Sequence, residues 1–105
     1  MKTYEGQRTL RGIKVTVDGV PLPPRMDLRC FSKTGFEWTY VGPGPRQLAL
    51  ALLADHLADD ATAQACTEAF MQTVVAYLDN DWCLTSPDID EALVEIRRPA
   101  PAPLT

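Results

Sequence analysis

The sequence predicts an α+β domain, in which a three-stranded antiparallel sheet is followed by three helices. Apolar and polar residues alternate at 10–17, 26–31 and 36–41, as in strands with one buried face. After residue 45, apolar residues dominate or recur at intervals of three and four, as in helices. Because 105 residues suit one domain, we expect a single domain at 1–98 and a flexible proline-rich tail at 99–105.

The first predicted strand covers residues 10–17, where every second residue from Ile13 to Val17 is apolar. Asp18-Gly19 then supplies a turn. Pro21, Pro23 and Pro24 lack the N–H that a ladder needs, so we expect an extended connector there rather than a paired strand.

Two further strands, at 26–31 and 36–41, are predicted to form a hairpin around a turn at 32–35. The side of the sheet that faces the helices would then carry Ile13, Val15, Val17, Leu28, Cys30, Phe36, Trp38 and Tyr40.

The first predicted helix covers residues 45–57 and is apolar nearly all round, which favours a central position in the core. Pro45 suits its first position, because the missing N–H would be unpaired there. A second helix, capped by Asp59 or Asp60, is predicted to end near Asn80.

An extended link at 82–84 is expected to lead to the third helix. Ser86 is its predicted cap, with proline and an acidic residue in the first turn. Ile89, Ala92, Leu93 and Ile96 form its predicted inner stripe.

Composition argues against several classes of protein. No apolar run approaches the roughly 20 residues of a membrane helix, so a cytoplasmic protein is expected. Cys30, Cys66 and Cys83 fit neither a zinc pattern nor a disulfide framework, and reduced thiols are expected. His56 is the only conventional base for a nucleophile. We therefore expect no catalytic residues, metal or cofactor.

Charge is divided unevenly along the chain. Residues 1–46 carry eight Lys and Arg against four Asp and Glu, whereas residues 47–105 carry two against ten. If strands and helices form separate layers, one outer face would be mildly basic and the other strongly acidic. Such an acidic half would repel phosphate, so no direct nucleic-acid binding is expected.

The segment WTYVGPGPRQLALALLADHL resembles a family of short uncharacterised prokaryotic domains with a core like W-G-Y-x-G-S-G-P-x-Q-L-A-L-A-I-L. The matching residues are Trp38, Tyr40, Gly42, Gly44, Pro45, Gln47, Leu48, Ala49, Leu50 and Ala51. Thr39 and Pro43 stand where the family pattern has glycine and serine. The resemblance implies a prokaryotic or mobile-element origin and no assigned activity. Gln47 would be either a polar site residue or a residue that forms a hydrogen bond with the backbone of the hinge at 42–47.

Two functions fit these observations. The first is a small acidic non-enzymatic protein, for example a phage inhibitor, whose acidic helical face docks on a basic surface of a larger host complex. Its candidate residues are Asp59, Asp60, Glu68, Asp79 and Asp81. The alternative is binding of a small ligand or anion at the hinge before the first helix, by Gly42, Gly44, Arg46 and Gln47. A homo-oligomer is a third possibility.

Overall fold

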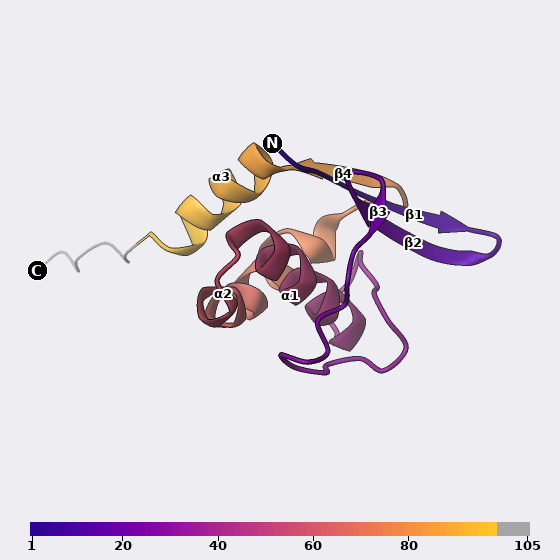
Figure 1. The fold of residues 1–105 in the computed structure, drawn as a ribbon, viewed down its shortest axis with the longest axis horizontal. Coiled ribbons are helices and arrows are strands. Elements are labelled where there is room, and N and C mark those ends of the chain that lie inside the picture. The colour runs from indigo at the N-terminus through magenta and orange to yellow at the C-terminus, as the bar shows by residue number, and fades with distance from the viewer. Residues whose placement is uncertain (99–105) are drawn as a thin grey trace, which may run out of the picture.

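The structure, a computed structural model, describes residues 1–98 (Figure 1). The predicted tail at 99–105 lies outside the described residues. In chain order the elements are β1 (Thr3–Thr9), β2 (Gly12–Val17), β3 (Val20–Pro21), α1 (Pro43–Leu57), α2 (Asp60–Thr73), the 3-10 helix η1 (Val75–Tyr77), β4 (Trp82–Thr85) and α3 (Ser86–Ile96).

The predicted α+β class, with three α-helices and an antiparallel sheet, is confirmed, but the predicted number of strands is wrong. The sheet has four strands in the order β3-β2-β1-β4, and every neighbouring pair is antiparallel. Strand β1 was missed because its inner face carries Tyr4, Gly6 and Arg8, which give no apolar alternation. The link expected at 82–84 is instead strand β4, which pairs with β1 from Thr3 to Gly6.

The turn between β2 and β3 is the predicted one. Asp18 and Gly19 both have positive φ, 49° and 84°, as a two-residue type I′ hairpin turn requires. The expectation of an unpaired connector after it is wrong, because Val20 and Pro21 pair with Val17 and Thr16. Strand β3 lies at the edge of the sheet, so the N–H that Pro21 lacks is not needed for a further strand.

The predicted hairpin of 26–31 and 36–41 is absent, since residues 22–42 contain neither helix nor strand. Among the residues assigned to its inner face, Trp38 is fully buried, but Cys30 is exposed and Tyr40 is 50% exposed. Ile13 of β2 is also 38% exposed. Alternation misled here because contacts with α1, rather than a strand partner, fix this segment, as described below.

Helix α1 begins at Pro43, two residues before the predicted start, and ends at Leu57 as expected. Its residues from Gln47 to Ala54 are all buried. Ala58 closes the helix with a φ of 52°, and its N–H donates to Ala54 O. A left-handed residue at this position satisfies a carbonyl that would otherwise lack a partner.

The second helix is shorter than predicted, because α2 ends at Thr73 and η1 follows. Asp59 is its N-cap, as expected, and accepts a hydrogen bond from Thr62 N. The cap of α3 is Thr85 rather than Ser86, because Thr85 and Asp88 form a reciprocal capping box. The predicted start of the third helix is therefore correct to within one residue.

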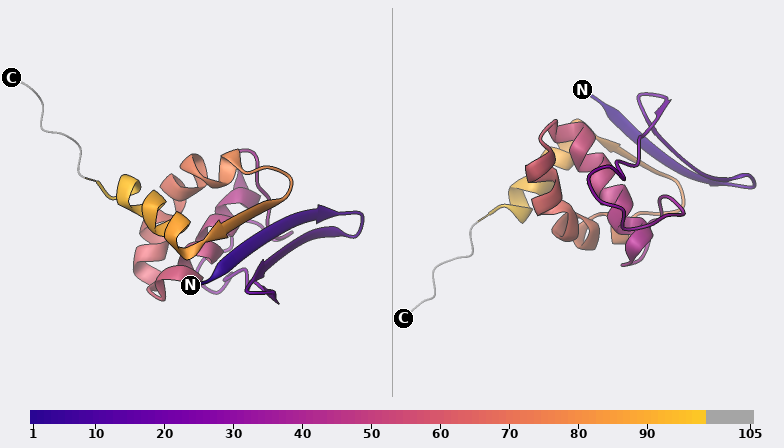
Figure 2. Two further views of the ribbon diagram at one scale, coloured as in Figure 1. Left: turned by 90° about the horizontal axis from the view of Figure 1, so that it is seen from above. Right: turned by 60° about the horizontal axis from the view of Figure 1, so that its bottom comes forward.

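The helices α1 and α2 lie on one side of the sheet (Figures 1 and 2). Tyr4 and Val15 point into the core from β1 and β2, whereas Glu5, Gln7 and Lys14 are exposed. The largest fully buried side chains are Trp38, Tyr4, Phe70, Leu48, Leu50, Leu52 and Leu53. The core therefore joins the inner face of the sheet to α1, α2 and the loop that carries Trp38.

Thr39 has a φ of 86°, which is unfavourable for a β-branched residue. We expect Thr39→Gly to be about 1 kcal/mol more stable than Thr39→Ala, because glycine adopts positive φ without a steric cost. Both variants lose the bond from Thr39 Oγ1 to Leu78 O, 2.9 Å long, so their difference isolates the backbone term. Urea denaturation of the pair measures it, and equal stabilities would contradict the expectation.

Candidate functional site

The polar groups of the hinge residues bind other parts of the chain. Gln47 is fully buried, and its Oε1 accepts from Phe31 N (2.8 Å) and Ser32 N (3.3 Å). Its Nε2 donates to Pro24 O (2.6 Å) and Arg29 O (3.1 Å). Gln47 thus fastens the loop at 24–32 to α1, and the hinge backbone is not among these partners.

The two hinge glycines allow close packing. A Cβ on Gly44 would lie 2.6 Å from Glu37 Cβ, and one on Gly42 would lie 2.9 Å from the Tyr40 ring. Arg46 makes a bidentate ion pair with Glu68, with distances of 2.6 and 3.1 Å. The four hinge residues are therefore occupied by contacts within the chain.

Ion pairs join the basic and acidic halves of the sequence. Lys2 Nζ lies 3.1 Å from Asp55 Oδ2, Arg25 Nη2 lies 3.2 Å from Asp60 Oδ2, and the Arg46–Glu68 pair is the third. The guanidinium of Arg46, followed by a bond from Gln72, lowers the pKa of Glu68. Three of the ten acidic residues at 47–105 are thus paired with cations from the first half of the chain.

The five candidate acidic residues differ in their surroundings. Asp59 accepts hydrogen bonds from Thr62, which lower its pKa, and Asp60 and Glu68 are ion-paired. Asp79 and Asp81 are exposed in the connection between η1 and β4 and make no ion pair within residues 1–98.

A cluster around Arg8 holds that connection in place. The Arg8 guanidinium donates to Asn80 Oδ1 (2.6 Å), Glu37 Oε1 (3.0 Å) and Trp38 O (2.8 Å). It also stacks 4.6 Å from the centre of the Trp38 ring, whose Nε1 donates to Asn80 O (3.2 Å). Sequence reasoning missed this cluster, because a lone arginine in a polar segment gives no signal of what it binds.

Exposed apolar side chains lie on the segments that this cluster positions. Tyr40 is 50% exposed, Val41 56% and Tyr77 80%. Thr39 N donates to Val75 O (3.1 Å) and Thr39 Oγ1 to Leu78 O, so the segments 39–41 and 75–78 lie against each other. This surface and the acidic residues that follow it in the chain comprise Tyr40, Val41, Tyr77, Asp79 and Asp81. We call it the tyrosine patch.

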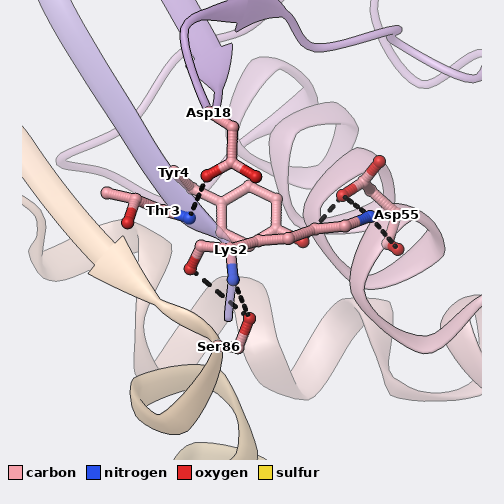
Figure 3. Close-up of polar contacts among 6 residues, drawn as sticks. All are labelled: Lys2, Thr3, Tyr4, Asp18, Asp55 and Ser86. Carbon is pink, nitrogen blue, oxygen red and sulfur yellow. Dashed lines mark hydrogen bonds and ion pairs between the residues drawn. The ribbon is translucent and has the colours of Figure 1, made fainter.

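The N-terminal strand is fixed by a second polar cluster (Figure 3). Tyr4 is fully buried, and its hydroxyl donates to Asp55 Oδ2 (2.7 Å), which also pairs with Lys2. The Lys2 N–H donates to Ser86 Oγ (2.8 Å), and Thr3 N donates to Asp18 Oδ1 (2.9 Å). Burial, followed by the bond to Asp55, raises the pKa of Tyr4 well above its ordinary value, so its hydroxyl is a donor and not a base at neutral pH.

We expect Tyr4→Phe to destabilise the protein by about 2 kcal/mol at pH 7, the typical size of a hydrogen bond to a charged acceptor. The raised pKa stabilises the wild type fully below the unfolded value of 10.0, and this contribution is lost as pH rises further. Wild-type stability should therefore fall above pH 10 by about 1.4 kcal/mol per unit more steeply than that of Tyr4→Phe. Urea denaturation of both proteins from pH 8 to about 11 tests this, and parallel curves would contradict it.

Hinge residues line none of the following three cavities within residues 1–98. One, of about 190 Å³, lies on the outer face of the sheet and is lined by Glu5, Gln7, Lys14, Thr16 and Gly19. The other two, of about 290 and 460 Å³, flank α3. Within residues 1–98 there is no group of three or more His, Cys, Asp or Glu side chains that could hold a metal ion. The helices of this part of the chain are all too short or too polar to cross a membrane.

Comparison with curated proteins and with solved structures gave no significant match. A family model, in contrast, matches residues 4–95, which include all the strands and helices except the first residue of β1 and the last of α3. The chain therefore belongs to this family, the family of unknown function DUF6166.

Proposed function

We propose that this protein is a non-enzymatic interaction protein, whose tyrosine patch docks on a basic surface of a larger protein. The observation that carries the proposal is that Tyr40 and Tyr77, which are 50% and 80% exposed, lie on adjoining segments, and that Asp79 and Asp81, which follow Tyr77 in the chain, have no cation partner within residues 1–98. Tyrosine is enriched among residues that dominate binding energy, and unpaired acids favour a cationic partner.

The contacts that hold the segments of the tyrosine patch in place support this proposal. Both the side chain and the carbonyl of Asn80, which lies between the two acids, are bonded to the Arg8–Trp38 cluster. Thr39, which precedes Tyr40, is bonded to η1 and to the residue after it. A surface held in one arrangement before binding loses less conformational entropy on docking.

The proposed surface is narrower than the acidic face expected from sequence. Asp59, Asp60 and Glu68 already cap a helix or neutralise an arginine, so we assign them at most a place at the rim. Asp79 and Asp81 are assigned to the contact itself. The hinge is not proposed as a ligand site, because its side chains are engaged elsewhere.

A protein that covers a basic surface excludes whatever else that surface binds. We propose inhibition of a cytoplasmic nucleic-acid-binding complex of a prokaryotic host as the biological role, since such complexes present basic surfaces to phosphate groups. A gene carried by a phage or another mobile element would fit that role.

Photo-crosslinking tests the proposal. A photoreactive amino acid at position 77, or at the control position 14 on the outer sheet face, is introduced and irradiated in lysate of the source organism. We expect a crosslinked protein from position 77 alone, weakened by salt and reduced at least ten-fold by Asp79→Lys or Asp81→Lys. Glu5→Lys, which changes the net charge equally on the outer sheet face, should have little effect. A product that forms equally from both positions, or is unaffected by the reversals, would refute the proposal.

A further inference from the structure

We infer that a second copy of this chain docks antiparallel on the exposed face of α3, which gives an isologous dimer. Val94 lies at the middle of this face, and its apolar side chain is 59% exposed to solvent. A cavity lies on each side of the helix. One is lined by Thr73, Val74, Ala92, Glu95 and Ile96, and the other by Leu57, Asp90, Leu93, Val94 and Arg97.

The position of α3 leaves this face open. The helix follows β4 and runs along the flank of the helical layer, with its C-terminal end pointing away from the sheet (Figures 1 and 2). Ile89 and Leu93 are buried against the body, whereas Glu91, Val94 and Arg97 are exposed. The exposed residues lie three apart, so they follow one stripe of the helix.

The order of charges along α3 selects a second copy, and its orientation. In an antiparallel pair whose two-fold axis passes at Val94, each residue faces the one equally far on the other side of position 94. Arg97 of one copy then faces Glu91 of the other, and Arg98 faces Asp90, at both ends of the contact. In a parallel pair, Glu91 would face Glu91 and Arg97 would face Arg97. The sequence DIDEALVEIRR is therefore self-complementary only when antiparallel.

Glu91 and Arg97 are the charges that should contribute most to the orientation of the dimer, because Asp90 and Arg98 already have ion pairs within the chain. Asp90 Oδ1 lies 2.6 Å from His56 Nε2, and Arg98 Nη2 lies 2.9 Å from Glu95 Oε1. Glu91 and Arg97 have no such pair in the described part of the chain. They are consequently the two charges whose pairing a second copy would supply.

The size of the contact predicts a weak dimer. Helix α3 has 11 residues, so it is about 16 Å long, and a single helix pair of this length falls below the usual area of stable interfaces. Val94 and the apolar cavity walls supply the attraction, and the charges set the orientation. Association should therefore depend on concentration and weaken as salt is added.

Charge-swap variants test the dimer by sedimentation equilibrium. Glu91→Arg and Arg97→Glu each place like charges opposite one another, so each alone should lower the association constant at least ten-fold. The double variant Glu91→Arg/Arg97→Glu restores opposite charges and should associate like the wild type. A mixture of the two single variants should form a heterodimer for the same reason.

Two further variants complete the test. Val94→Asp should abolish association, while Glu5→Lys, on the outer sheet face, should leave it unchanged. All substituted side chains are exposed, and circular dichroism checks that each variant is folded. A wild type that stays monomeric at millimolar concentration would overturn the inference, as would single variants that associate as strongly as the wild type. Neither result bears on the tyrosine patch, which lies on other elements.

Discussion

Gln47→Leu is expected to destabilise the protein by about 3 kcal/mol, because leucine has nearly the same size but cannot replace any of four hydrogen bonds. The lost bonds involve the amides of Phe31 and Ser32 and the carbonyls of Pro24 and Arg29. Each group left without a partner in a partly buried place costs about 1–3 kcal/mol. The two carbonyls belong to exposed residues and can reach water, so the total stays below the sum.

Urea denaturation measures this change, with Gln64→Leu as the matched control. Gln64 lies exposed on α2, so the same substitution there should change stability by less than about 0.5 kcal/mol. Hydrogen exchange adds a local measurement, since the amides of Phe31 and Ser32 should exchange much faster in Gln47→Leu. A loss no larger than that of the control would mean that Gln47 does not fasten the loop.

The role of Gln47 shows what the sequence could and could not reveal about the candidate site. Its place in the G-P-x-Q-L-A-L-A motif indicates a residue of interest, but the prediction of a hydrogen bond to the hinge backbone names the wrong partner. Its partners lie 15 to 23 residues earlier in a loop without regular structure. No local pattern specifies such partners, and alternation alone predicts a hairpin in this loop.

The parts of the fold that were predicted correctly depend on local chemistry. The Asp18-Gly19 turn follows from residues that tolerate positive φ, and the Asp59 cap from an acid before a helix. The missed strand β1 pairs with β2 over six residues and with β4, about 80 residues away, over four, but its own sequence has no apolar alternation. Its inward Gly6 and Arg8 are explained only by Trp82 and Trp38, which other segments bring beside them.

Gly6 lies in β1 at the point where the Trp82 ring packs against the strand. A Cβ at this position would lie 2.3 Å from both Cε2 and Nε1 of Trp82. The ring has little room to move, because Trp82 is almost fully buried and packs edge to face on Trp38. The centroids of the two rings lie 5.8 Å apart. Its Nε1 is also buried and has no hydrogen-bond partner within residues 1–98, which indicates that close packing, rather than hydrogen bonding, holds the ring.

Gly6→Ala is therefore expected to destabilise the protein by about 3–4 kcal/mol, as overpacking either strains β1 or expels Trp82 from the core. A double-mutant cycle with Trp82→Leu isolates the clash, since a smaller side chain leaves room for the methyl group. In the Trp82→Leu background, Gly6→Ala should cost less than about 0.5 kcal/mol, because alanine is otherwise the better strand residue. Urea unfolding followed by far-UV circular dichroism measures all four proteins without depending on tryptophan fluorescence. Equal costs of Gly6→Ala in the two backgrounds would show that Trp82 does not require the glycine.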